Sequence, residues 1–344
     1  MVKNDSCENK TLLERKEACK MLVEKIKLYE GRDDVTLTTY VIEEQGELHG
    51  IGARPAVLIC PGGGYLNCSD REAEPIALKF AAMGYHAFVL RYSTYGEGAK
   101  EIYRNSDVIL PVRKECLYPT QILETGKAML IIREHAKEWE VDVDRIAICG
   151  FSAGAHNAAM YSATWHMDLL SSHFGVEKEV FRPAAAILSY MVNDYVDFDK
   201  LMENKNMTPT DQAMLRAGNI ALFGELNPSE EKRRMLSPGK LVTEYMPPTY
   251  IWSTAGDNVV PTQHSIRMAH ALADKKVPFE LHIFEEGQHG LSAADQSSAV
   301  ITEQKNADAA KWVELVDAWL KKRFSLKMQP PMTEMEYLKM IGVL

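Results

Sequence analysis

The strongest constraint on the fold is a buried-strand pattern that runs straight into a glycine-flanked serine and then into a helix. Residues 145–149 (Arg-Ile-Ala-Ile-Cys) lead into the motif Gly-Phe-Ser-Ala-Gly at 150–154, and the helix-like segment 155–160 follows. A turn this tight leaves no room for side chains at its flanks, so the two glycines hold Ser152 at the edge of a sheet. A serine in an ordinary turn gives the same five letters, so this interpretation needs support elsewhere in the chain.

A second glycine-rich turn lies upstream. The apolar segment 56–60 predicts a short buried strand, and Pro61 and three consecutive glycines at 62–64 follow it, before Tyr65. Glycines expose backbone N–H groups, which suits the stabilisation of a tetrahedral oxyanion. A phosphate-binding turn and a purely structural turn remain alternatives, although neither glycine spacing typical of nucleotide-binding sites is present.

A serine becomes a nucleophile only when a histidine accepts its proton and a carboxylate orients that histidine. Downstream of Ser152, the strand-like segments 248–254 and 279–284 end in loops that carry Asp257 and His289. Loops after the carboxyl ends of parallel strands meet at the edge where open sheets bind ligands. The order Ser, Asp, His is also that of the α/β-hydrolases.

These motifs resemble the acetyl-esterase/lipase branch of the α/β-hydrolases, and within it they are most similar to bacterial acetylxylan-esterase-like proteins. The similarity extends over roughly residues 35–323. The segments that carry it are 60–65, 69–75, 84–92, 150–154, 255–261 and 287–290.

The resemblance implies a catalytic triad and an oxyanion hole. The triad residues are Ser152, Asp257 and His289. The oxyanion-hole donors are the backbone N–H groups of Gly63, Gly64 and Ala153. Many relatives have a histidine before the triple glycine where this chain has Pro61, which leaves the N–H of Tyr65 as an alternative donor.

The activity that the resemblance implies is hydrolysis of short acyl esters by a serine esterase, above all of acetyl groups on xylo-oligosaccharides. Such an enzyme forms an acyl-enzyme and needs neither a metal nor a cofactor. An amidase or peptidase of the same fold, and a catalytically silent binding module, are the alternatives. Three tyrosines near the glycine loop and the predicted insertions are candidate sugar contacts, although packing is the ordinary role of such side chains. They are Tyr65, Tyr92 and Tyr118.

Strand patterns alternate with helical patterns along the chain, which predicts an α/β fold with a mostly parallel central sheet and helices on both faces. The predicted strands are 35–42, 56–60, 86–91, 145–149, 184–189, 248–254 and 279–284. The predicted helices include 120–138, 153–166, 261–275 and 306–323. We assign residues 35–324 to an α/β-hydrolase domain on this basis.

Four further segments lie outside this minimal pattern. Residues 1–34 form an N-terminal extension in which apolar residues over 11–30 predict an amphipathic helix. The segments 93–118 and 193–236 follow strands and are long for simple connections, so we expect them at the catalytic edge as pocket walls or a cap. Residues 325–344 read as a linker and a short apolar helix, which docks on the chain's own core or on a second copy in a homo-oligomer.

Composition narrows the class of partner and the compartment. The chain has 344 residues, 46% of them apolar, and a net charge of −9, which argues against nucleic acid because phosphate backbones attract basic patches. No run approaches the roughly twenty apolar residues of a membrane span, and residues 1–6 lack the apolar core of a signal peptide. The six cysteines form no Cys-x-x-Cys pair. We therefore expect buried free thiols, a cytoplasmic location, no membrane contact and a small ester as the substrate.

Overall fold

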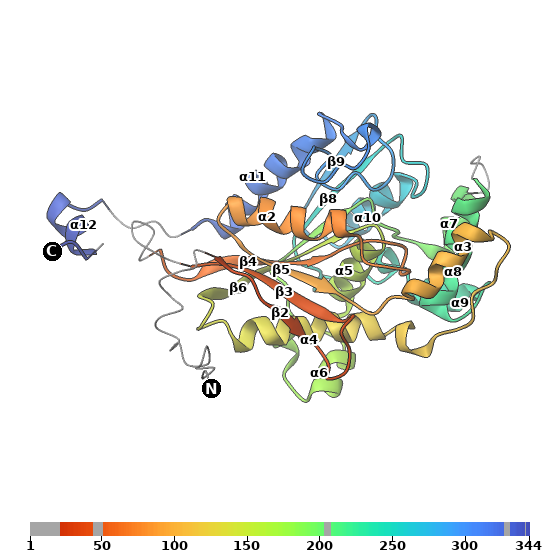
Figure 1. Ribbon diagram of the computed structural model, residues 1–344, viewed down its shortest axis with the longest axis horizontal. Helices are drawn as coiled ribbons and strands as arrows, with labels where there is room; N and C mark the ends of the chain where they lie inside the picture. The colour runs from red at the N-terminus through yellow and green to blue at the C-terminus, as the bar shows by residue number, and fades with distance from the viewer. Residues whose placement is uncertain (1–20, 44–50, 203–207, 327–330, 341) are drawn as a thin grey trace, which may run out of the picture.

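A nine-stranded sheet is the centre of the computed structural model, which describes residues 21–43, 51–202, 208–326, 331–340 and 342–344 (Figure 1). The strands follow the order β1-β3-β5-β4-β6-β7-β8-β9, and β2 pairs with β3. Their bounds are β1 Met21–Leu22, β2 Lys25–Lys27, β3 Thr36–Ile42, β4 Arg54–Cys60, β5 His86–Arg91, β6 Val141–Phe151, β7 Ala185–Ser189, β8 Thr249–Thr254 and β9 Phe279–Phe284.

From β5 to β9 all neighbouring strands are parallel, whereas β1, β2 and β5 each pair with β3 in the antiparallel direction. Leu58 on β4 lies opposite Phe88 of β5 and Ile148 of β6, so the middle of the sheet is built from three apolar strands in register. This arrangement confirms the mostly parallel sheet that the sequence predicts.

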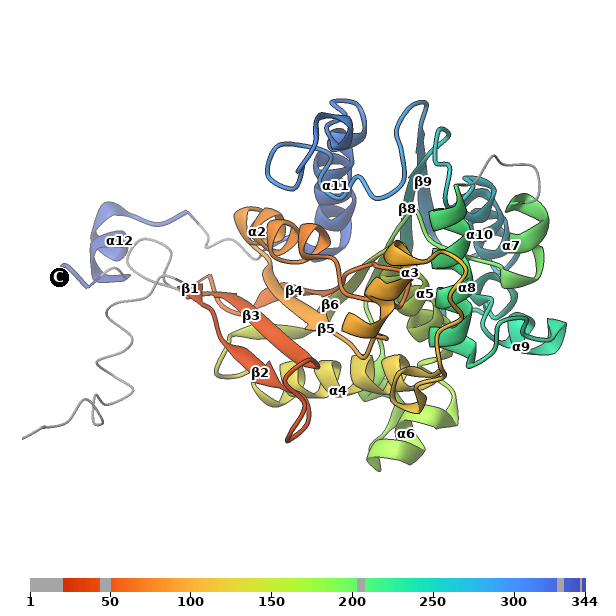
Figure 2. The same cartoon turned by 45° about the vertical axis from the view of Figure 1, so that its right-hand side comes forward.

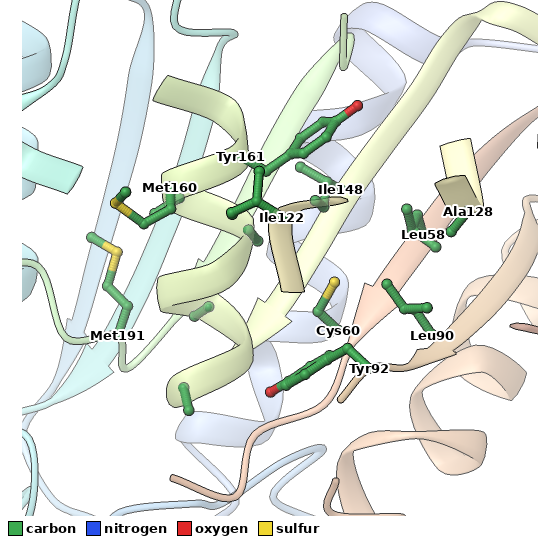
Figure 3. Close-up of a cluster of buried hydrophobic side chains, with 14 of the residues drawn as sticks. Leu58, Cys60, Leu90, Tyr92, Ile122, Ala128, Ile148, Met160, Tyr161 and Met191 are labelled. Atoms are coloured by element: carbon green, nitrogen blue, oxygen red, sulfur yellow. The ribbon is translucent and has the colours of Figure 1, made fainter. Parts of the chain in front are cut away.

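Both faces of the sheet are buried beneath helices. On β4 the side chains of Leu58 and Cys60 belong to one core cluster and those of Val57 and Ile59 to the other, as strand alternation requires. The first face is covered by α4 (Thr120–Glu134), α5 (Ala153–Thr164) and α10 (Gln263–Asp274), and Figure 3 shows its cluster. The second face is covered by α2 (Glu74–Ala82) and α11 (Trp312–Phe324). Helices on both faces are therefore confirmed.

The helix predicted over 11–30 is wrong in the part that the structure describes. Residues 11–20 lie outside the described residues, but β1 and β2 occupy the positions from 21 to 27. Ile26 and Leu28 turn inward while Lys25 and Lys27 are exposed, an alternation of period two that competes with the helical pattern. Gly31, with φ of 76°, lies in the turn between β2 and β3, so the segment becomes an antiparallel hairpin.

The two long segments that the sequence places at the catalytic edge form short helices that contact one another. Segment 93–118 contains α3, and segment 193–236 contains α7, α8 and α9; all four lie together on one side of the molecule in Figure 2. Arg216 of α8 donates a hydrogen bond to the carbonyl of Ser106 (2.6 Å), and α3 packs on α8. The bounds are α3 Glu101–Arg104, α7 Tyr195–Met202, α8 Pro209–Phe223 and α9 Glu230–Met235.

The remaining helices are short connections and the end of the tail. They are α6 Asp168–Phe174, α12 Glu334–Met340, and the 3-10 helices η2 Asp70–Glu72, η3 Glu97–Lys100, η4 Lys114–Cys116, η5 Lys178–Phe181, η6 Pro238–Lys240, η7 Thr302–Gln304 and η8 Ala309–Lys311. Among the described residues, no helix combines the length and the apolar character that crossing a membrane requires.

Candidate active site

Ser152 lies in the sharp turn between β6 and α5. Its backbone has φ of 51° and ψ of −119°, a conformation that non-glycine residues rarely adopt and that is found in strained turns at functional sites. A Cβ atom at Gly150 would lie 2.3 Å from the carbonyl oxygen of Gly154, and one at Gly154 would lie 2.0 Å from that of Cys60. The glycines are therefore required by close backbone packing, as the sequence predicts.

Ser152, His289 and Asp257 come together from three loops at the carboxyl edge of the sheet. The Ser152 hydroxyl lies 2.8 Å from Nε2 of His289, and Nδ1 of His289 lies 2.7 Å from Oδ2 of Asp257. The second oxygen of Asp257 accepts hydrogen bonds from the backbone N–H groups of Val259 (2.9 Å) and Val260 (2.8 Å). With the Nδ1 proton held by the carboxylate, Nε2 is left as a proton acceptor for the serine.

Electrostatics raise the proton affinity of His289. Burial of the ring lowers its pKa, but the negative charge of Asp257, their hydrogen bond and the charge of Glu72 outweigh that effect. The net result is a pKa above the ordinary value of histidine. An imidazole in this setting is a better base than one buried without a carboxylate partner.

Three backbone N–H groups of the cavity lining are candidate donors to an oxyanion. Within the part of the chain that the structure describes, the N–H groups of Gly63, Gly64 and Ala153 donate no hydrogen bond. All three residues line the same cavity as Ser152 and His289. Gly63 has φ of 131°, and a Cβ atom there would lie 2.2 Å from the carbonyl oxygen of Asn67, so only glycine fits this tight loop.

The cavity above Ser152 has a volume of about 260 Å³. One wall is apolar and comes from α7, α8 and the loops after β7 and β8. Its side chains are Val192, Tyr195, Phe198, Met214, Leu215, Val259 and Val260. The lining also carries polar groups from η2, from the residue before η2 and from α8, namely Ser69, Arg71, Glu72, Asp211 and Asn219. Segment 193–236 therefore forms much of the cavity wall.

Of the three tyrosines predicted as sugar contacts, Tyr65 lines this cavity, whereas Tyr92 and Tyr118 are absent from its wall among the described residues. Tyr92 is buried beneath the glycine loop, where its hydroxyl donates to the carbonyl of Pro61 (2.6 Å). Tyr118 pairs through its backbone N–H with the carbonyl of Leu222 (3.1 Å). Both side chains pack in or against the core beneath the sheet face that carries Leu58, and their predicted contact with a sugar stays a prediction.

His156, one turn into α5, has a local role. Its Nε2 lies 2.8 Å from the carbonyl oxygen of Leu236, and its Nδ1 lies 2.5 Å from the hydroxyl of Tyr65. Burial lowers the pKa of His156 to about 4, so the ring is neutral near pH 7. A carbonyl accepts only from an N–H, so Nε2 carries the proton and Nδ1 accepts from Tyr65.

The sequence prediction missed Glu72, Arg71 and Tyr190, which contact the catalytic loops. Arg71 and Glu72 lie in the segment 69–75 that carries the family resemblance, but that resemblance gave them no role. The ring of Tyr190 packs edge-on against that of His289 with 5.1 Å between centroids. The adjacent arginine and glutamate after the glycine loop are a signal for Arg71 and Glu72, but no local pattern marks Tyr190.

Comparisons with known proteins find similarity to esterases and related hydrolases. A family model described as BD-FAE matches residues 103–272, which include Ser152 and Asp257. The endo-1,4-beta-xylanase B of Butyrivibrio fibrisolvens is 31% identical over 243 residues, which cover 70% of this chain and 33% of the xylanase. The chain spans between 33% and 50% of the length of the curated relatives it matches.

Two solved structures share the fold over nearly the whole chain. The carboxylesterase Cest-2923 of Lactobacillus plantarum has a TM-score of 0.68 and 26% identity, with 90% of this chain and 100% of the other covered. An acetyl ester-xyloside bifunctional hydrolase of Caldicellulosiruptor lactoaceticus has a TM-score of 0.63 and 26% identity, with 87% and 96% covered. The fold is that of the α/β-hydrolases, and the similar proteins are esterases and hydrolases.

Proposed function

We propose that this chain, an α/β-hydrolase that resembles the acetyl esterases and lipases, is a serine carboxylesterase that removes short acyl groups through an acyl-enzyme. The observation that carries the proposal is the continuous hydrogen-bonded line from Ser152 through His289 to Asp257, at the base of a cavity. The nucleophile, the base and the residue that orients the base each have the contact that their role requires.

In the first half of the reaction, Nε2 of His289 takes the proton of Ser152 as the hydroxyl oxygen attacks the ester carbonyl. Asp257 holds the Nδ1 proton and stabilises the imidazolium that forms, while Val259 and Val260 fix the carboxylate by donating to its other oxygen. His289 then passes the proton to the departing alcohol, which leaves the acyl group on Ser152.

The negative charge on the carbonyl oxygen needs donors that are already in place. The N–H groups of Ala153, Gly63 and Gly64 supply them, and each such donor typically contributes on the order of 3 kcal/mol to transition-state stabilisation. In the second half of the reaction, His289 activates a water molecule, which attacks the acyl-enzyme and frees Ser152.

For the substrate we propose acetyl esters of sugars, such as acetylated xylo-oligosaccharides. The similarity to a xylanase and to an acetyl ester-xyloside hydrolase supports this choice. The polar part of the cavity lining also suits a sugar, because Ser69, Asp211 and Asn219 offer groups that can exchange hydrogen bonds with hydroxyls. We further propose that segment 193–236 caps the cavity and that segment 93–118 supports this cap through the contact of α3 with α8. The cytoplasmic location remains a prediction from the sequence.

The direct test is acetate release from acetylated xylo-oligosaccharides, beside p-nitrophenyl acetate, for wild type and Ser152→Ala. We expect the variant to lose both activities and the wild type to show the higher kcat/KM on the sugar acetate. If Ser152 is required but only the aryl ester is cleaved, the serine mechanism stands and the proposal of a sugar acetate as substrate is wrong. Equal activity of variant and wild type would show that Ser152 is not the nucleophile.

A further inference from the structure

One buried carboxylate beside the cavity takes no part in the acyl-transfer steps described above. Glu72, at the end of η2, is 4% exposed. Its Oε2 accepts a hydrogen bond from the backbone N–H of Gly62 (2.8 Å), and its Oε1 accepts one from the hydroxyl of Tyr190 (2.7 Å). Both carboxylate oxygens are therefore used, which is what a buried charge requires.

The same hydrogen bonds continue into the loop that carries His289. The hydroxyl oxygen of Tyr190 accepts from the backbone N–H of Ser292 (3.0 Å), three residues after His289. The residue before Tyr190 is also tied to the nucleophile, since the N–H of Ser152 donates to the carbonyl of Ser189 (3.0 Å). One carboxylate thus links the loops after β4, β7 and β9.

Space around Gly62 is filled by this arrangement. A Cβ atom at Gly62 would lie 2.7 Å from Oε2 of Glu72 and 2.9 Å from Cβ of Ser152. The glutamate therefore packs directly against the backbone that leads into Gly63 and Gly64. A shift of Glu72 would move the start of the proposed oxyanion loop relative to the nucleophile.

Arg71, the residue before Glu72, also contacts the loop that carries His289. Its guanidinium donates to the carbonyl oxygens of Gly290 (2.9 Å) and Ser298 (2.6 Å), and the hydroxyl of Ser292 donates to the backbone carbonyl of Arg71 (2.5 Å). The turn that holds Glu72 is therefore itself attached to the histidine loop, and the two loops keep a fixed separation.

We propose that Glu72 is a positioning residue for acyl transfer, which holds the oxyanion loop and the His289 loop in register and places a second negative charge near His289. The proposal rests on the proposed function, because it assigns Glu72 to the same serine reaction. Its charge acts in the same direction as that of Asp257, favouring the imidazolium that forms when Ser152 attacks.

The charge of Glu72 raises the pKa of His289, as does that of Asp257. Burial raises the pKa of Glu72 itself, against the hydrogen bonds from Tyr190 and Gly62 and the charges of His289 and Arg71. Among the described residues, the charged or titratable groups that contact His289 or line the cavity with it come from several elements. They are Asp257 from the loop after β8, Glu72 and Arg71 from η2, Tyr190 from the loop after β7, Tyr65 from the glycine loop, and Tyr195 and Asp211 from α7 and α8.

The experiment is a pH profile of p-nitrophenyl acetate hydrolysis for wild type, Glu72→Gln, Tyr190→Phe and the control Glu74→Gln. The glutamine keeps an acceptor oxygen but removes the charge. We expect kcat of Glu72→Gln to fall on the order of 10- to 100-fold with KM nearly unchanged. The acid limb of its kcat/KM profile should move to lower pH, because His289 loses a charge that favours its protonated form.

Tyr190→Phe breaks the hydrogen-bonded link but leaves the charge and the ring. It should lower kcat while its acid limb stays at the wild-type pH, and it decides the positioning role if Glu72→Gln does not fold. Glu74, on α2, pairs with Arg91 of β5 (2.9 Å) and is not among the described residues of the cavity wall, so Glu74→Gln should behave as wild type.

Wild-type kcat in Tyr190→Phe, or wild-type kcat and acid limb in a folded Glu72→Gln, would overturn the inference. Ser152→Ala, measured in the same series, separates this failure from that of the proposed function. If Ser152→Ala is inactive while the Glu72 and Tyr190 variants match wild type, only the role of Glu72 is lost.

Discussion

Glu72 and Glu124 are two buried carboxylates that hold loops at the same edge of the sheet, but they hold different loops. Glu72 accepts from Gly62 and Tyr190 and so contacts the loops that carry the catalytic groups. Glu124, on α4, is fully buried and accepts from both the backbone N–H (2.6 Å) and the hydroxyl of Ser93, in the loop after β5.

The loop after β5, which Glu124 contacts through Ser93, is hydrogen-bonded to the end of the glycine loop. The backbone N–H groups of Tyr95 and Gly96 donate to the carbonyls of Tyr65 and Leu66, at 2.9 Å each. Burial raises the pKa of both carboxylates, so neither burial nor a shifted pKa distinguishes a catalytic contribution from a structural one. The two carboxylates differ in the loops to which their hydrogen-bond donors belong. The donors to Glu72 lie in loops that carry catalytic groups, so we expect Glu72 to affect kcat, whereas the donor to Glu124 lies in the loop after β5, so we expect Glu124 to affect stability.

Of the three carboxylates Asp257, Glu72 and Glu124, only Asp257 has a hydrogen bond with His289 among the described contacts. Its substitution should therefore cause the largest loss of kcat. Asp257→Asn should lower kcat by about 10⁴-fold, since an amide fails to hold the Nδ1 proton in the required tautomer. The measurement is steady-state hydrolysis of p-nitrophenyl acetate, with thermal unfolding to verify the fold. A loss no larger than that of Glu72→Gln would contradict the assigned roles.

The second prediction concerns pH and stability. Burial raises the pKa of Glu124 from 4.5 to about 7 against the hydrogen bonds from Ser93 and the charge of Arg32. Between these values the folded protein binds more protons than the unfolded chain, so this carboxylate's contribution to stability falls as pH rises from 4.5 to 7, by on the order of 3 kcal/mol.

Glu124→Gln removes this titration, and unfolding midpoints at pH 5 and pH 8 measure the consequence. The wild type should lose more stability than the variant between the two values, while kcat at pH 8 should be nearly the same for both. Parallel pH dependence in the two proteins would show that Glu124 does not titrate in this window.

Ser93→Ala addresses the partner of Glu124. The variant leaves one buried carboxylate oxygen without its hydroxyl donor, which should cost about 1–3 kcal/mol in the free energy of unfolding. We expect kcat to stay within about twofold of wild type, because the backbone donor of Ser93 and the Tyr95 contact remain. Chemical denaturation gives the first quantity, and a large fall in kcat at unchanged stability would reverse the comparison.

Tyr92→Phe has the smallest expected effect. It removes the hydroxyl that donates to the carbonyl of Pro61, for which about 1 kcal/mol of stability is expected. Because Tyr92 is not part of the described cavity wall, KM for p-nitrophenyl acetate and for acetylated xylo-oligosaccharides should not change. A higher KM for the sugar alone would restore Tyr92 as a substrate contact.

The parts of the molecule that the sequence predicts well are those specified by local patterns. The strand before Ser152, its flanking glycines and the positions of Asp257 and His289 at strand ends each follow from a few adjacent residues. Sheet topology then brings the three side chains together without further information.

The parts that the sequence does not predict depend on contacts between distant segments. Glu72 and Tyr190 are 118 positions apart, so their bond follows only from the placement of β7 relative to η2. The sequence also does not predict that Tyr92 and Tyr118 pack in or against the core, because the direction of a side chain at a strand or helix end is set by packing. The helix predicted over residues 21–27 was wrong because helical and strand periodicities overlap there, and pairing with β3 favours the strand.

The most direct test of the account is the identity of the acylated residue during turnover. Wild-type protein mixed with p-nitrophenyl acetate, quenched in acid within the first turnover and digested, would be analysed by mass spectrometry. We expect an acetyl group on Ser152, and a burst of p-nitrophenol equal to the enzyme concentration when deacylation is slower than acylation. Turnover with no acetyl group on Ser152, together with full activity of Ser152→Ala, would contradict it.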